Sequence, residues 1–309
     1  MTRAFVIARR RKGRRMGQAV HETKVRLDAA GWKVETCLVD RKSDLRRRAK
    51  GAVKAGTDVV VAVGGDGAVL QVVQVLAGKK VALGIIPMGT GNLLASNLGI
   101  PRGTEQAAEI LVHGDHRQID IGHLRVHGKR ELFTVACGVG FDAEVMKQTS
   151  KRAKLRWGKL AYVASAIGQR KRVRNVGHRI TLDGRRTSMR ATQVFLANFG
   201  GVGLAVEPRL EVEPDDGYLD VIAISASGAL RGLRSGWEAL RQGEPGESPN
   251  GHAYRAKARE IRIEVKSTRL VEVDGSVIGT TPITASVRPA ALTVIAPAKS
   301  RTTSASAER

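Results

Sequence analysis

The chain has 309 residues, long enough for two domains with separate cores, and only 4% of them are aromatic. Its 52 Lys and Arg residues outnumber its 29 Asp and Glu residues, and the resulting net charge of +23 favours phosphorylated metabolites, nucleic acid or anionic membranes. The scarcity of aromatic residues argues against base stacking, so we expect no specific nucleic-acid partner. No signal peptide and no apolar run of about 18 residues is found, which predicts a cytoplasmic protein with at most peripheral membrane association.

The first third of the chain alternates patterns of strands and helices. Strands are predicted over residues 3–8, 32–39, 59–63 and 80–86, and helices over residues 18–30, 43–54, 68–76, 93–98 and 104–113. This alternation predicts an α/β domain with a parallel sheet. The loop at residues 9–15, which includes Gly13, carries six positive charges and either grips phosphate groups or is a solvated turn. The basic residues of the helix at 43–54 are interpreted as a solvated face.

The central strand runs without polar alternation from Val59 to Val63 and ends in the turn Gly64-Gly65-Asp66-Gly67. A strand, a glycine turn and a helix together aim backbone N–H groups and a helix N-terminus at an anion. A carboxylate repels phosphate, so Asp66 fits this turn if it holds Mg²⁺ or accepts a proton from an attacking hydroxyl. The alternative is a tight turn in which Asp66 caps the following helix.

A second glycine loop follows the next strand, with the sequence Pro87-Met-Gly-Thr-Gly-Asn92. The two loops are expected at the same edge of the sheet, because the carboxyl ends of parallel strands lie together. Two such loops can enclose a nucleotide, and chance produces a pair far less often than one.

From about Ile121 onward, short alternating runs replace the strand–helix rhythm. They lie at residues 123–126, 131–137, 179–182, 192–197, 219–224, 260–265, 270–273 and 292–295, and they predict an all-β second domain. A helix at residues 159–169 is flanked by basic clusters and either packs on the sheet or lies against anionic lipid.

These motifs and those downstream resemble the diacylglycerol kinase catalytic domain family, which includes bacterial lipid kinases and sphingosine kinases. The similarity begins with residues 64–67 and 87–92 and continues at residues 120–122, 137–144, 157–162, 198–201, 214–220, 273–276 and 288–297. The ordered series spans roughly residues 3–297, which makes it far more specific than one tetrapeptide.

The resemblance implies an α/β plus all-β architecture of the NAD kinase and diacylglycerol kinase type. A Rossmann-like nucleotide-binding domain would span residues 1–122, a β-sandwich domain residues 123–297, and a disordered tail residues 298–309. ATP would bind with Mg²⁺ between the domains, and its γ-phosphate would pass to a hydroxyl of a diacylglycerol- or sphingoid-type lipid at the membrane surface.

The resemblance also implies roles for individual residues. Asp66 and Asp274 are the expected catalytic groups, and Asp142 is expected near the acceptor lipid. A structural Mg²⁺ is expected at Glu213, Asp216 and Tyr218, with Asp216 as the side-chain ligand; the alternative for Asp216 is an ordinary turn aspartate. The expected nucleotide-binding residues are Gly13, Gly64, Gly65, Gly67, Gly89, Thr90 and Asn92.

Four positions depart from the family pattern. The first loop keeps only Gly13 of Asn-Pro-x-Ser-Gly, Ala68 replaces a Thr, Leu93 replaces an Asp, and Ser276 replaces the late Glu that is the proposed general base. Two alternatives to an active lipid kinase follow: a catalytically impaired member that binds nucleotide or anionic lipid, and a kinase of a soluble acceptor. NAD kinases and phosphofructokinases share the Gly-Gly-Asp-Gly turn, but the downstream series favours the lipid kinases.

Overall fold

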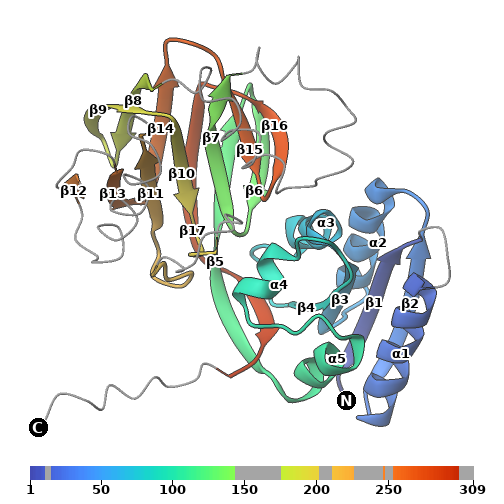
Figure 1. Cartoon of the computed structure of the whole chain (residues 1–309). Coiled ribbons are helices and arrows are strands. Elements are labelled where there is room, and N and C mark those ends of the chain that lie inside the picture. Colours follow the sequence, from blue (N-terminus) through green and yellow to red (C-terminus); the bar gives the residue numbers. More distant parts are fainter. Residues whose placement is uncertain (11–14, 143–174, 202–210, 226–245, 248–252, 299–309) are drawn as a thin grey trace, which may run out of the picture.

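The computed structural model describes residues 1–10, 15–142, 175–201, 211–225, 246–247 and 253–298. An α/β unit and a β-sandwich are joined by two long strands (Figure 1). The predicted fold class is therefore confirmed. Within the described residues, no helix is long and apolar enough to cross a membrane.

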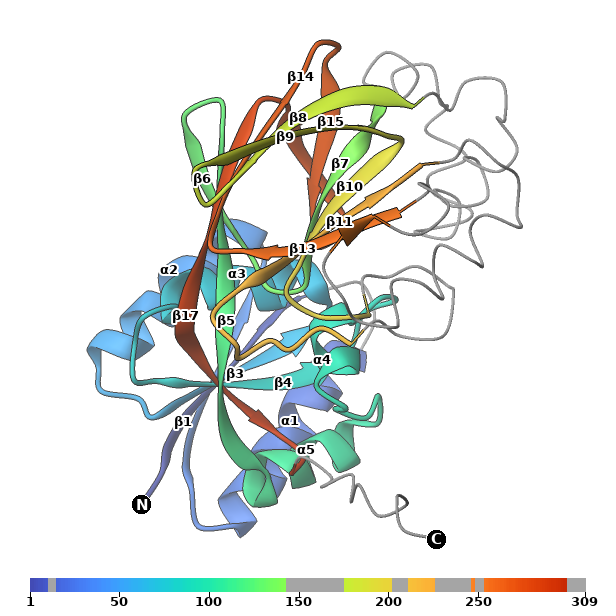
Figure 2. The same ribbon diagram turned by 90° about the vertical axis from the view of Figure 1, so that its left-hand side faces the viewer.

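The α/β unit is built on a parallel sheet with the strand order β2-β1-β3-β4. Helices α1 and α5 pack together on one face, and α2 and α3 pack together on the other (Figure 2). The elements are β1 (Arg3–Arg9), α1 (Arg15–Ala29), β2 (Lys33–Val39), α2 (Lys42–Lys54), β3 (Val59–Gly64), α3 (Asp66–Leu76), β4 (Ala82–Pro87), α4 (Leu93–Asn97) and α5 (Thr104–His113). Because β1, β3 and β4 are parallel, their carboxyl ends meet at one edge of the sheet.

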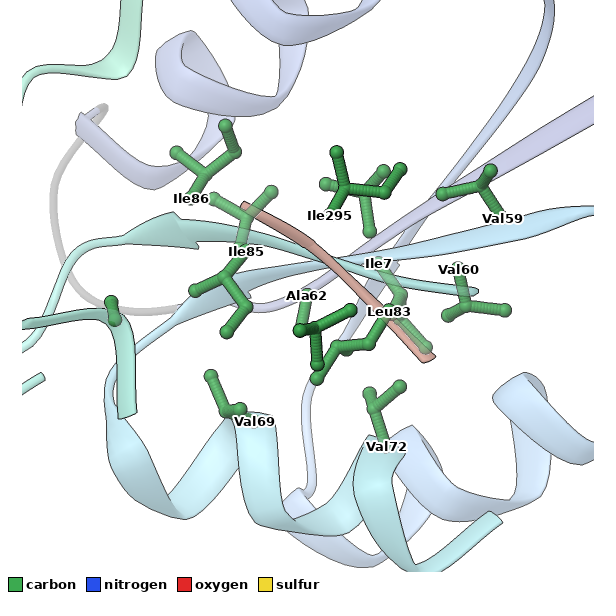
Figure 3. Close-up of a cluster of buried hydrophobic side chains, with 14 of the residues drawn as sticks. Ile7, Val59, Val60, Ala62, Val69, Val72, Leu83, Ile85, Ile86 and Ile295 are labelled. Atoms are coloured by element: carbon green, nitrogen blue, oxygen red, sulfur yellow. The ribbon is translucent and has the colours of Figure 1, made fainter. Parts of the chain in front are cut away.

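The core of this unit explains why β3 and β4 contain apolar runs without polar alternation. Every residue of both strands is buried, since helices cover both faces of the sheet. Figure 3 shows Val69 and Val72 of α3 directed at the sheet next to Ala62 and Leu83. The same packing fixes the start of α3, and with it the glycine turn that precedes the helix.

The β-sandwich packs two antiparallel layers face to face. One layer has the strand order β12-β13-β11-β10-β7-β15-β16, and the other is the far part of the larger sheet, where β9, β8, β14, β17, β5 and β6 lie. The strands are β5 (Asp115–Val126), β6 (Lys129–Phe133), β7 (Ala136–Asp142), β8 (Val176–Leu182), β9 (Arg185–Ala191), β10 (Gln193–Ala197), β11 (Leu219–Ile224), β12 (Gly246–Glu247), β13 (Ala253–Ala258), β14 (Glu260–Val265), β15 (Arg269–Val273), β16 (Ser276–Thr280) and β17 (Ile283–Ala296). Both layers contribute to one apolar core, with Phe133 and Ile180 from the larger sheet and Val139 and Leu196 from the smaller.

Strands β5 and β17 form an antiparallel pair that runs through both units. Ile121 of β5 and Val294 of β17 belong to the core of the α/β unit, whereas Leu124 and Ile283 belong to the core of the sandwich. The end of β17 also pairs in parallel with β4. The expected division after residue 122 therefore lies inside β5, and β17, the last of the described strands, completes the sheet of the N-terminal unit.

Most predicted elements are confirmed, and the differences have local causes. The single strand predicted over residues 131–137 is wrong: the chain leaves the larger sheet after β6 and enters the smaller one at β7. The edge strand β9 was missed because its sequence is mostly polar, and β13 and β16 were also missed. The helix predicted at residues 159–169 and residues 299–309 of the predicted tail lie outside the described residues.

Candidate active site

The two glycine loops predicted from the sequence touch each other. Gly64 ends β3, and its carbonyl oxygen accepts a 2.9 Å hydrogen bond from the N–H of Met88 in the second loop. A Cβ atom on Gly65 would lie 2.9 Å from the Cα of Gly89, and a Cβ on Gly89 would lie 2.5 Å from the Cα of Gly65. The backbones are thus in direct contact, which leaves no room for a side chain at either position.

The Asp66 carboxylate joins the first loop to the second. Its Oδ2 accepts a 3.1 Å hydrogen bond from the N–H of Asn92, and its Oδ1 accepts one from the N–H of Leu93. These N–H groups begin α4, so Asp66 caps the neighbouring helix. The alternative that Asp66 caps its own helix is wrong, because Gly65 holds the N-cap position of α3 without a side-chain bond.

Asn92 shapes the second loop from inside. It has a left-handed backbone, with φ of 52°, and serves as the N-cap residue of α4. Its side chain accepts from the N–H of Gly89 and donates to the carbonyl of Gly89, both at 2.8 Å. Thr90 is exposed on the same loop, where its hydroxyl is accessible to a ligand.

Lys42 reaches the first loop from another element, and the sequence analysis missed it. It is the first residue of α2, and its Nζ lies 3.1 Å from the position that a Cβ on Gly67 would occupy. Within the described residues, no hydrogen bond or ion pair engages this ammonium. The signal was present in the topology: α2 follows β2, which is parallel to β1, so the start of α2 falls at the edge that carries both loops.

Helix α4 connects the second loop to the sandwich. Asn97, its last residue, donates a 2.9 Å hydrogen bond to the carbonyl of Gly201 and accepts one of 2.9 Å from the N–H of Gly201. Gly201 lies in the segment after β10 that begins with Asn198. The hydrogen bonds at the two ends of α4 therefore link Asp66 to the C-terminal unit.

Asp274 lies in the turn between β15 and β16, with φ of 44°, and is 8% exposed. Its carboxylate accepts four hydrogen bonds of 2.9–3.1 Å, from the N–H groups of Thr134, Val135 and Ala136 and from the Thr134 hydroxyl. Burial raises the pKa of this carboxyl, and the four hydrogen bonds oppose the shift. Asp274 therefore holds the segment where the chain passes from β6 to β7. None of these four hydrogen bonds reaches the glycine loops.

Asp120 is a buried junction residue that the sequence analysis singled out only as part of a motif. Its carboxylate accepts 2.7 Å hydrogen bonds from the N–H groups of Gly217 and Ala290, and its own N–H donates to the carbonyl of Pro214. Burial raises the pKa of its carboxyl. Three distant parts of the chain therefore meet at Asp120, where the two units join.

The residues expected to hold a structural metal ion make other contacts in the structure. Oδ1 of Asp216 accepts a 2.9 Å hydrogen bond from the N–H of Tyr218, and its Oδ2 pairs with the ammonium of Lys257 at 2.5 Å. The ring of Tyr218 stacks under the guanidinium of Arg259, 4.7 Å away. Within the described ranges, no group of three or more His, Cys, Asp or Glu side chains could hold a metal ion.

Two expected site residues lie at or beyond the limit of the described structure. Asp142 is the last residue of β7, but its side chain is not among those described. Gly13 lies outside the described residues. The other expected nucleotide-binding residues, Gly64, Gly65, Gly67, Gly89, Thr90 and Asn92, all lie in the two touching loops.

The chain is similar to known proteins over nearly its whole length. Residues 3–124 match the diacylglycerol kinase catalytic domain, and residues 135–296 match the YegS C-terminal NAD kinase beta sandwich-like domain. A diacylglycerol kinase of Mycobacterium tuberculosis is 32% identical over 289 residues, which cover 91% of this chain and 90% of the relative. A diacylglycerol kinase of Bacillus subtilis is 28% identical and covers 83% of this chain and 84% of the relative.

A solved structure shares the fold. A diacylglycerol kinase from Bacillus anthracis str. Sterne superposes with a TM-score of 0.72 at 21% identity and covers 96% of this chain and 97% of that chain. The class is therefore a two-domain protein with an α/β unit and an NAD kinase-like β-sandwich. Within this class, the chain belongs to the diacylglycerol kinase catalytic domain family.

Proposed function

We propose that the protein is an ATP-dependent lipid kinase that transfers the γ-phosphate of ATP to a hydroxyl of a diacylglycerol- or sphingoid-type lipid. The relatives named diacylglycerol kinase support the reaction class. The observation that carries the proposal is the contact between the two glycine loops, with Asp66 bonded across them. Phosphoryl transfer requires mainly positioning and charge neutralisation: the loops would supply the positioning, and Lys42 with a metal ion held at Asp66 would supply the neutralisation.

The nucleotide would bind along the two loops. The bare backbones of Gly64, Gly65, Gly67 and Gly89 allow the close approach of phosphate oxygens, and the start of α3 adds its N-terminal partial charge. Thr90 would offer its hydroxyl, Asn92 holds the loop in shape, and Gly13 would contribute from the basic loop. Lys42 stands beside Gly67 and would supply a positive charge to the phosphates.

Asp66 would act at the reacting phosphate. Mg²⁺ bound with ATP would neutralise phosphate charge, and Asp66 is the carboxylate that would hold it or accept the proton of the lipid hydroxyl. The hydrogen bonds that Asp66 accepts from two N–H groups hold its carboxylate between the loops. The orientation of the carboxylate is therefore set before any ligand binds. Ser276 cannot act as a carboxylate base at neutral pH, so Asp66 is the group proposed for this step.

The acceptor lipid would be met by the sandwich. Asp142, at the end of β7, would contact the acceptor hydroxyl. Asp274 anchors Ala136 at the start of the same strand, so it would act on the reaction by positioning β7. The protein would act in the cytoplasm, and its net charge of +23 favours contact with anionic membrane surfaces, where such lipids lie.

Transfer from labelled ATP to a total lipid extract tests this function. The wild type is expected to yield a labelled lipid, and Asp66→Asn is expected to lower its rate at least 100-fold, because the amide can neither hold a metal ion nor accept a proton. Asp44→Asn is the matched control, since Asp44 is paired with Arg47 on α2.

Three other outcomes would contradict the proposal. Equal rates in the wild type and Asp66→Asn would exclude the proposed function of Asp66. Tight ATP binding with no transfer to any acceptor would support the impaired binder, which Ser276, Ala68 and Leu93 favour. Transfer to NAD or a sugar without a lipid product would identify a kinase of a soluble acceptor.

A further inference from the structure

The segment that ends at β11 concentrates negative charge beside the junction of the two units. Glu213, Asp215 and Asp216 precede β11, and Asp220 is its second residue. The segment is held at the junction through Pro214 and Gly217, which both bond to Asp120. A charge of this density, folded against a buried aspartate, requires a compensating cation close by.

Strand β13 supplies two cations to this segment. Residues two apart on a strand point to the same side, and Arg255 and Lys257 are such a pair. Arg255 bonds the buried Asp220 carboxylate at 2.6 Å and also donates to the carbonyl of Glu211. Lys257 stands opposite Asp220 in the register of β11 and β13, and its ammonium lies 2.5 Å from Oδ2 of Asp216.

The Lys257 ammonium lies among the carboxylates of the acidic segment. It donates a hydrogen bond to Oδ2 of Asp216, and Lys257 is paired with Asp220 in the strand register. The side chain of Asp216 is 16% exposed and that of Lys257 is 41% exposed, so the pair is sheltered on the side of the aspartate. A divalent ion at Asp216 would have to displace the ammonium, because two adjacent cations repel each other.

We propose that Lys257 is a built-in cation that takes the place of a structural divalent metal ion at Glu213, Asp216 and Tyr218. The ammonium neutralises the acidic segment and holds Asp216 in its turn, so the segment keeps its contacts with Asp120 without metal. This inference concerns the folding of the segment and does not depend on the kinase activity.

Metal dependence of the full-length protein tests the proposal in the absence of nucleotide. After treatment with a chelator, the Tm of the wild type is expected to stay unchanged when millimolar Mg²⁺ is added. Lys257→Met is expected to lower the Tm in chelator, and Mg²⁺ is expected to restore part of the loss, because the freed Asp216 carboxylate becomes a ligand. Lys266→Met, at an exposed lysine beyond β14, is the matched control and should change neither value.

Direct binding of Mn²⁺ provides the second measurement. Lys257→Met is expected to bind one Mn²⁺ at least tenfold more tightly than the wild type, and Lys257→Met with Asp216→Asn is expected to lose that gain. The proposal is overturned if the wild type itself binds one Mn²⁺ that Asp216→Asn abolishes, since the metal would then displace Lys257. If Lys257→Met fails to fold, the Mn²⁺ titration of the wild type still tests the proposal. Lys257→Arg, which keeps the positive charge, should behave as the wild type.

Discussion

Gly65 and Gly89 meet through their backbones, so a methyl group on either residue would push the two loops apart. The same contact places the Asp66 carboxylate within reach of the N–H groups of Asn92 and Leu93. One atom of extra volume at Gly65 therefore affects the proposed phosphate site and the start of α4 together. Interiors this tightly packed do not absorb such an atom without strain.

Gly65→Ala is expected to destabilise the protein by about 1–3 kcal/mol and to weaken ATP binding at least tenfold, because the new Cβ would lie 2.9 Å from the Cα of Gly89. Urea unfolding and titration with a fluorescent ATP analogue measure the two effects. Gly17→Ala in α1 is the control: nothing lies within 4 Å of its added Cβ, and alanine favours a helix by up to about 1 kcal/mol. Normal ATP binding by Gly65→Ala would show that the nucleotide does not bind at these loops.

At the scale of the element, strand β8 contains a histidine that is buried in its neutral form. His178 is 1% exposed, and its Nδ1 lies 3.0 Å from the carbonyl oxygen of Val176. Burial lowers its pKa below the ordinary value of 6.5, and the positive charge of Arg269 lowers it further. The unfolded chain therefore takes up a proton at a higher pH than the folded strand does.

The contribution of His178 to the free energy of unfolding is expected to be constant above about pH 6.5. Below that pH it is expected to fall by up to about 1.4 kcal/mol per pH unit. His178→Gln should reduce this slope, measured by urea unfolding between pH 5 and pH 7.5. His123 contributes a residual slope, because burial and nearby arginines lower its pKa as well. An unaltered slope in His178→Gln would refute the assignment of this pH dependence to His178.

Sequence patterns predicted those elements whose signal is local. The apolar run of β3 and the glycines after it identified the strand, its turn and the sheet edge that the turn shares with the second loop, but not the direct contact between the loops. No local pattern reveals that Asp274 bonds Thr134, 140 positions earlier, or that Asp120 bonds Ala290, 170 positions later. Such bonds depend on which strands become neighbours, and the chain encodes that only through the packing of the whole fold.

At the scale of the whole molecule, the excess of 23 positive charges is spread over both units. Lys42 and the other basic residues of α2 lie in the α/β unit, and Arg185, Arg186 and Arg190 lie on the edge strand β9 of the sandwich. Each Lys or Arg near an anionic membrane surface contributes about 1 kcal/mol of attraction at low salt. The charge thus predicts attraction to anionic membrane surfaces.

The protein is expected to sediment with vesicles that contain anionic phospholipid and not with vesicles of phosphatidylcholine alone. Binding should weaken steeply as salt rises from about 0.05 to 0.5 M, because screening shortens the reach of surface charges. Co-sedimentation across this range checks the expectation. Equal binding to both vesicle types, or binding that salt leaves unchanged, would show that charge does not drive membrane contact.

Strand β17 has a consequence for how the protein is made. The sheet of the N-terminal unit takes its last strand from residues that leave the ribosome after the entire sandwich has been synthesised. Until then, β4 exposes an open edge, and Leu83 lacks the neighbour that Val294 provides. The nascent N-terminal unit therefore keeps an open sheet edge until β17 has been synthesised, and a ribosome that stalls within the sandwich would leave both cores unfinished.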